Sequence, residues 1–159
     1  MFTLKQLNSM KTYEIWPYSL VLVMFGLLPT AAIAQADKLV GVWLNQDKDG
    51  RIEIYERANR YFGKIVWLNE PNEPNGQPKR DEKNPDTSLR NRQLLNLILL
   101  KNLHYKGENQ WDDGSIYDAR NGQTYRCKAT LRNPSTLDLR GYVGFSLLGR
   151  TTTWTRVSY

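Results

Sequence analysis

The segment QTYRCKATL, residues 123–131, decides the fold class that we assign to this chain of 159 residues. Alternate positions from Tyr125 to Leu131 are apolar, and the positions between them are polar or charged. This period of two is typical of a β-strand with one buried face. Short runs of the same kind recur along the chain and are separated by turn residues at close intervals. The pattern predicts an antiparallel all-β domain.

About eight short strands are predicted in this way, and an up-and-down connection is the simplest way to join them. Turn residues stand at Asp49-Gly50, Asn121-Gly122 and Asn133-Pro134-Ser135, where Gly and Asn tolerate the backbone of tight turns. We therefore expect a single antiparallel up-and-down β-barrel. The predicted strands are Val40–Leu44, Arg51–Glu56, Tyr61–Leu68, Leu95–Leu100, Ser115–Tyr117, Gln123–Leu131, Thr136–Val143 and Arg150–Val157.

A long connection between the third and fourth predicted strands, from Asn69 to Asn91, breaks the alternating pattern. It holds four prolines and the charge cluster Lys79–Lys83. Its end is predicted to form a short helix of one or two turns, with Asn84 as the cap and Pro85 at the first position. A lid over an open barrel end and a solvated crossover loop are both compatible with such a segment.

The N-terminal part of the sequence predicts export. The apolar run Leu20–Leu28 follows two lysines and precedes Pro29 and a stretch of small residues, which is the pattern of a secretory signal peptide. The run is shorter than the roughly 20 residues of a membrane-spanning helix. We expect a cleaved signal peptide at residues 1–36, with cleavage after Ala34 or Ala36. The domain at residues 37–159 would then be periplasmic or secreted.

The composition limits the functions to consider. The chain has 22 Lys and Arg against 16 Asp and Glu, a formal charge of +6, and one Cys, so it has no internal disulfide. The basic residues form no stripe or stacking platform, which argues against a nucleic-acid partner. The excess charge favours a weak, salt-sensitive contact with anionic surfaces of the cell envelope.

A tryptophan and an arginine at the two ends of the domain indicate how the barrel closes. Gly41-Val42-Trp43 lies on the first predicted strand and Arg156 on the last, and these strands meet in a closed barrel. An arginine stacked on the indole of Trp43 would close one end by a cation-π contact. Gly41, Trp43 and Arg156 are therefore assigned to barrel closure. This pairing resembles the signature of lipocalins and other calycins.

The domain also resembles a family of small exported bacterial proteins known as domain of unknown function 2147. The resemblance implies a lipocalin-like barrel and export, and it brings no established activity. Members often carry two cysteines near the positions of Arg57 and Phe62, and this chain has neither. The matching stretches are Gly41–Leu44, Glu53–Glu56, Gly63–Leu68, Asn84–Asp86, Leu89–Arg92, Ile116–Asp118, Asn121–Tyr125, Arg140–Gly144 and Gly149–Val157.

Three patterns that suggest catalysis or metal binding are better explained by structure. Residues 45–56 match the spacing of an EF-hand calcium loop, but the flanking residues favour strands, so we expect a hairpin turn. His104 is the only histidine, and Cys127 is expected to be buried and inert. The three carboxylates near Gly114 are expected to form turns and not to act in catalysis; they belong to Asp112, Asp113 and Asp118. We therefore predict no catalytic residues, no metal and no cofactor.

The favoured hypothesis is a periplasmic, non-enzymatic lipocalin-like protein that holds a small, partly apolar molecule in its barrel, with an anionic head group as one option. The alternative is a cell-envelope protein-interaction or inhibitor module with a filled barrel and a protein partner. Four arginines could converge on an anionic head group: Arg90, Arg92, Arg140 and Arg150. The candidate ligand-binding residues are Asn84, Asp86, Arg90, Arg92, Trp111, Tyr117, Tyr125, Arg140, Tyr142 and Arg150.

Overall fold

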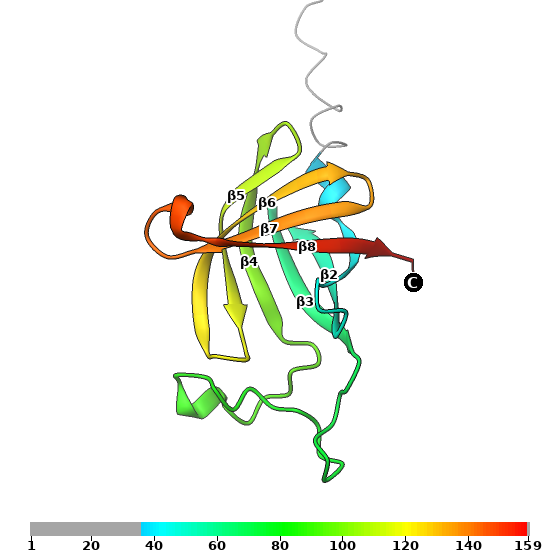
Figure 1. The fold of residues 1–159 in the computed structure, drawn as a ribbon, viewed down its shortest axis with the longest axis vertical. Coiled ribbons are helices and arrows are strands. Elements are labelled where there is room, and N and C mark those ends of the chain that lie inside the picture. Colours follow the sequence, from blue (N-terminus) through cyan, green and yellow to red (C-terminus); the bar gives the residue numbers. More distant parts are fainter. Residues whose placement is uncertain (1–35, 159) are drawn as a thin grey trace, which may run out of the picture.

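The computed structural model describes residues 36–158, which form a closed barrel of eight antiparallel strands. Each strand pairs with its neighbours in the sequence, and the first strand closes the barrel against the last (Figure 1). The predicted up-and-down barrel is confirmed. The strands are β1 (Gly41–Leu44), β2 (Gly50–Arg57), β3 (Arg60–Leu68), β4 (Ile98–Gly107), β5 (Gln110–Asp118), β6 (Gln123–Asn133), β7 (Thr136–Tyr142) and β8 (Arg150–Val157).

Three short 3-10 turns complete the described structure: η1 (Asp37–Leu39), η2 (Thr87–Leu89) and η3 (Ser146–Leu148). The helix expected in the long connection is the single turn η2. The predicted signal peptide lies outside the described residues, except for its last residue, Ala36. No helix in the described part of the chain is long and apolar enough to span a membrane.

The fourth and fifth strands differ most from the prediction. The structure extends β4 to Gly107 and begins β5 at Gln110, so a tight hairpin joins them. Two irregular residues interrupt the alternation of side chains that the prediction used: Asn102 in β4 has φ 60° and Asp113 in β5 has φ 62°. The register shifts between Trp111 and Gly114, so the period-two pattern is lost there although the strand continues.

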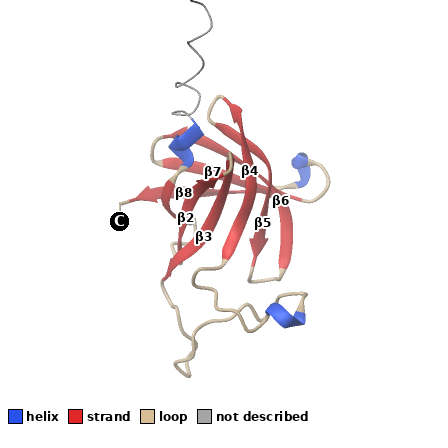
Figure 2. Cartoon of the chain, turned by 180° about the vertical axis from the view of Figure 1, so that it is seen from behind, coloured by secondary structure: helices blue, strands red, loops and turns tan. Residues whose placement is uncertain are grey.

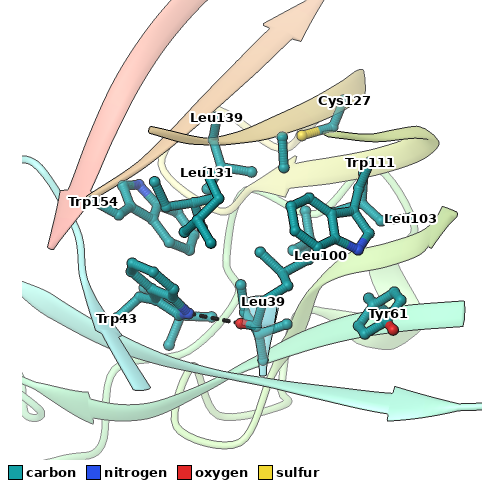
Figure 3. Packing of buried hydrophobic residues seen from close by; sticks show 14 residues of the cluster. Leu39, Trp43, Tyr61, Leu100, Leu103, Trp111, Cys127, Leu131, Leu139 and Trp154 are labelled. Atoms are coloured by element: carbon teal, nitrogen blue, oxygen red, sulfur yellow. Dashed lines mark hydrogen bonds between the residues drawn. The ribbon is translucent and has the colours of Figure 1, made fainter. Parts of the chain in front are cut away.

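Large apolar side chains fill the interior of the barrel. Three tryptophans, Trp43, Trp111 and Trp154, pack with leucines from opposite walls (Figure 3). Trp111 is fully buried and lies edge-on to Tyr61, with ring centroids 6.2 Å apart. The core cluster consists of Leu39, Trp43, Ile52, Ile54, Tyr61, Leu100, Leu103, Trp111, Cys127, Ala129, Leu131, Leu137, Leu139 and Trp154.

One end of the barrel is closed by η1 and by the expected tryptophan and arginine. The indole nitrogen of Trp43 donates a hydrogen bond of 3.0 Å to the carbonyl of Leu39, which anchors η1 at this end of the barrel (Figure 3). The Arg156 guanidinium lies 4.2 Å from the centre of the Trp43 ring and donates to the backbone carbonyls of Val40 and Pro134. This guanidinium therefore ties the two ends of the domain together.

Gly41 has to be glycine at this closed end. Its φ is 140°, and a Cβ added there would lie 2.3 Å from a guanidinium nitrogen of Arg156. Any side chain at Gly41 would displace Arg156 from Trp43. The residues assigned to closure are thus in mutual contact.

Cys127 is buried in the core, as expected, and burial raises the pKa of its thiol to about 12. The unfolded chain releases this proton near the ordinary thiol pKa of about 8.5. Between these two pKa values the folded barrel retains the proton and the unfolded chain does not. The free energy of unfolding is therefore highest below the unfolded pKa and falls as the pH rises from there to the folded pKa. We expect the loss of stability between pH 9 and pH 11 to be smaller in Cys127→Ala, as measured by urea unfolding. An identical pH dependence in both proteins would contradict this assignment.

Candidate functional site

The long connection between β3 and β4 is an ordered loop of residues 69–97 that lies beyond the end of the barrel opposite η1 (Figure 1). Two isolated β-bridges, Asn72 with Pro78 and Arg80 with Gln93, give the loop its own framework. The loop carries η2 next to the tip of the β5–β6 hairpin, as Figure 2 shows from behind. We call this segment the long loop.

A buried carboxylate, Asp81, fixes the long loop to the barrel. Its Oδ1 accepts a hydrogen bond of 2.6 Å from the Tyr117 hydroxyl on β5. Its Oδ2 accepts from the Arg92 guanidinium at 2.7 and 2.9 Å and from the Asn84 amide at 2.7 Å. Asp81 is 0% exposed although it belongs to a loop. These four residues form the Asp81 network.

The Asp81 network is built for positioning. Both carboxylate oxygens of Asp81 are occupied by donors from the protein, and the Tyr117 hydroxyl also accepts from Asn84 at 3.2 Å. Burial and the hydrogen bond to Asp81 raise the pKa of the Tyr117 phenol, which therefore stays protonated at neutral pH. A carboxylate with no free oxygen is poorly placed to accept a proton from a substrate.

Contacts at the hairpin tip reinforce the docking of the long loop. Gly122 has φ 74°, and a Cβ added there would lie 1.9 Å from the backbone carbonyl oxygen of Lys83. The prediction that Asn84 caps the short helix is wrong, because Asp86 is the cap and accepts from the Ser88 amide. Asn84 is instead buried and reaches Asp81, which a solvent-exposed cap could not do.

A groove of about 210 Å³ lies between the long loop and the wall formed by β4, β5 and β6. Apolar side chains share it with two cations, Arg92 and Lys101, and with hydroxyl groups. A second hollow of about 420 Å³ adjoins it and shares Arg92, Ile98 and Lys101. The groove is lined by Asn84, Pro85, Leu89, Arg92, Ile98, Leu99, Lys101, Ser115, Tyr117 and Thr124.

The groove lies on the outer face of the barrel wall. Along β5, Gly114 pairs with the core residue Cys127, and Ile116 packs against the core. Because side chains alternate along a strand, Ser115 and Tyr117 point outward. Thr124 on β6 pairs with Tyr117 and shares its face. The expected cup inside the barrel is occupied by the core cluster, whose fourteen residues line neither of the two hollows among the described residues.

The structure gathers part of the candidate residue list. Asn84, Arg92 and Tyr117 meet at Asp81, and the Arg90 side chain donates to the backbone carbonyl of Asn84 at 2.7 Å. Asp86 lies at the start of η2 on the same loop. Of these residues, Asn84, Arg92 and Tyr117 line the groove.

The other candidates lie elsewhere. Trp111 is a core residue, and the Tyr125 hydroxyl accepts from Asn121. Arg140 points outward from β7 and donates to the carbonyls of Ser146 and Leu147 beside η3.

The ring of Tyr142 lies under the Arg126 guanidinium, and its centre is 5.6 Å from the guanidinium carbon. Arg150 pairs with Gly141 at the start of β8. Of the four arginines considered for one anion, Arg90 and Arg92 therefore lie on the long loop, whereas Arg140 and Arg150 lie on β7 and β8.

The sequence analysis missed the buried carboxylate of Asp81, the cation Lys101 and the apolar and hydroxyl side chains that line the groove. Asp81 was part of a charge cluster that looked solvated, and its burial depends on Tyr117, which is 36 residues away. Lys101 lies on β4, where the predicted strand ended one residue earlier. A carboxylate within a proline-rich loop that also contains arginines was the available signal for Asp81.

The suspected calcium loop is a β-hairpin. Asn45 closes the turn through its side chain, which accepts from the backbone amides of Asp49 and Gly50. Glu56 lies at the far end of β2 and accepts from the Asn59 amide. In the part of the chain that the structure describes, no three His, Cys, Asp or Glu side chains are grouped so that they could hold a metal ion.

The closed eight-stranded barrel with its tryptophan and arginine at one end defines a lipocalin-like fold. Its fold is similar to that of a solved structure described as protein HP1028 from the human pathogen Helicobacter pylori, which belongs to the lipocalin family. The two chains are 24% identical, with a TM-score of 0.68 over 76% of this chain and 83% of the other. No curated protein sequence matched the chain.

Residues 41–156 match the model of the family DUF2147, described as uncharacterized protein conserved in bacteria. The chain belongs to this family. The resemblance seen in the sequence is thereby confirmed.

Proposed function

We propose that this protein is a non-enzymatic binding protein that holds a small, partly apolar anionic molecule in the groove under the long loop. The observation that carries the proposal is the groove itself, with cations and apolar side chains side by side and a loop fixed above it by a buried carboxylate. The lipocalin-like fold supports a role in small-molecule binding. The proposal puts the ligand on the barrel wall and not inside the barrel, because the core cluster occupies the interior.

The chemistry of the lining indicates the class of ligand. Leu89, Ile98 and Leu99 offer an apolar surface to a hydrocarbon part of a ligand. Lys101 has no ion pair among the described residues, and an ammonium group of this kind suits a carboxylate or phosphate. Arg92 also lines the groove, but its charge is balanced by the ion pair with Asp81, so Lys101 carries the free positive charge of the lining. A fatty acid or a similar amphiphile fits this arrangement.

A titration with dodecanoate tests the site. We expect Lys101→Glu to weaken binding by about tenfold or more, because one charge-assisted contact becomes a repulsion. Lys48→Glu is the matched control, since it makes the same change of charge on the exposed β1–β2 turn, whose residues do not line the groove. Equal affinities of the wild type and Lys101→Glu by isothermal titration calorimetry would contradict the groove.

The proposal places this binding protein in the periplasm or outside the cell. Its support is the leader-like sequence of residues 1–36, which precedes the first barrel strand at Gly41. Cell fractionation with N-terminal sequencing tests it. We expect a protein in the periplasmic or secreted fraction that begins at Gln35 or Asp37, and an intact N-terminus in the cytoplasm would overturn the export proposal without affecting the groove.

A further inference from the structure

The loop between β7 and β8, residues 143–149, is the most apolar exposed surface of the described chain. Its side chains are strongly exposed: Val143 69%, Phe145 81%, Leu147 90% and Leu148 82%. The loop carries η3 and projects from the side of the barrel in Figures 1 and 2. We call residues 143–149 the apolar tip. Exposed apolar groups clustered in this way mark a surface that contacts something.

The apolar tip is held with its side chains turned outward. The Arg140 guanidinium lies on its inner side and donates to the carbonyls of Ser146 at 2.7 Å and Leu147 at 3.1 Å. Gly149 packs against β7, where a Cβ would lie 2.6 Å from the carbonyl oxygen of Gly141. Backbone groups of the turn are therefore satisfied by the barrel, and the apolar side chains are left to the surroundings.

The base of this tip carries three arginines, Arg126, Arg140 and Arg150. Residues 119–159 contain seven of the 22 basic residues and one of the 16 acidic ones, Asp138, so this part of the chain accounts for the whole formal charge of +6. The other 118 residues carry 15 charges of each sign. Arg126 pairs with Tyr142 and Arg150 pairs with Gly141, directly at the base of the tip. Neither arginine has an ion pair among the described residues.

We infer that the apolar tip inserts into the surface of an anionic phospholipid membrane. A convex loop with Phe and Leu at its end and arginines at its base matches a bilayer, where apolar side chains enter the acyl region and cations meet lipid phosphates. The groove under the long loop of a second copy is a poor alternative host, because the ammonium group of Lys101 in its lining would repel the arginines of the tip.

Vesicle co-sedimentation tests the inference with a chain that begins at Gln35, one of the two expected mature N-termini, and so contains every residue of the core cluster. The probes are vesicles of phosphatidylglycerol and phosphatidylethanolamine, compared with phosphatidylcholine alone. We expect the wild type to bind the anionic vesicles, and the triple variant F145S/L147S/L148S to bind at least about tenfold less. Binding should fall as the salt concentration rises.

Two further variants separate the parts of this surface. We expect R126Q/R150Q to bind the anionic vesicles about tenfold less than the wild type and to lose most of the salt dependence. Arg140 is left unchanged in these variants because its side chain holds the backbone of the apolar tip. Leu95→Ser, which removes a 39% exposed leucine from the long loop, should bind like the wild type. Circular dichroism of each variant shows whether the barrel is intact.

Three results would overturn the inference. They are a wild type that stays in the supernatant, a triple variant that sediments like the wild type, and equal binding to both kinds of vesicle. Wild-type self-association that is lost in the triple variant, without vesicle binding, would assign the apolar tip to a contact between copies of the chain instead.

Discussion

Trp43→Ala is expected to lower the free energy of unfolding by about 3–5 kcal/mol, because the substitution leaves a large cavity at the closed end of the core. Trp43 is 0% exposed and holds two other elements in place. Its indole binds the carbonyl of Leu39, and its ring lies under Arg156. Loss of this residue therefore removes core packing and loosens η1 at the same time. Urea unfolding followed by circular dichroism measures the effect.

Trp67→Ala is the matched control for this prediction. Trp67 is partly exposed on β3 and lies 4.7 Å from the guanidinium carbon of Arg51. We expect its loss to cost only about 1 kcal/mol, which corresponds to a surface cation-π contact. Similar destabilisation by the two substitutions would mean that Trp43 has no special part in barrel closure.

Asp81→Ala is expected to release the long loop from the barrel and to lower stability by about 3 kcal/mol. The substitution leaves Arg92, Asn84 and Tyr117 without their buried acceptor, and removal of one partner from a buried ion pair costs about 3–5 kcal/mol. We expect the lower end of that range because the Arg92 side chain is 35% exposed. Hydrogen–deuterium exchange across residues 69–97 measures the release.

Two other substitutions show whether release of the loop depends on this network. Asp86→Ala removes only the exposed cap of η2 on the same loop, so we expect a local loss that is smaller than that of Asp81→Ala and a loop that stays docked. Gly122→Ala acts from the barrel side by pushing against Lys83, and it should raise exchange in the loop as Asp81→Ala does. Unchanged exchange in Asp81→Ala would show that other contacts fix the loop.

The barrel was predictable because its strands follow local rules. β6 and β7 alternate between buried and more exposed side chains over most of their length, and the predicted strand Arg150–Val157 has the bounds of β8. The closed end was predictable for a different reason, since the first and last strands of a barrel have to meet and so bring Trp43 to Arg156. These features require only the period of the side chains and the topology.

The site was less predictable because it depends on contacts between distant segments. The backbone irregularities at Asn102 and Asp113 hide the lengths of β4 and β5, and with them the wall that carries Lys101. Asp81 is buried only because Tyr117 and Arg92 approach it from other parts of the chain. Trp111 was expected near a ligand as an aromatic side chain, yet its place on the inner face puts it in the core.

The proposed place of the ligand is tested most directly by nuclear magnetic resonance of the ¹⁵N-labelled protein during titration with dodecanoate. We predict that amide signals of Lys101, Ser115 and Tyr117 shift with a common affinity, because these residues line the groove. Signals of Ala129 and Leu139, which belong to the core cluster, should stay in place. Shifts confined to Ala129 and Leu139 would contradict the groove and return the ligand to the interior of the barrel.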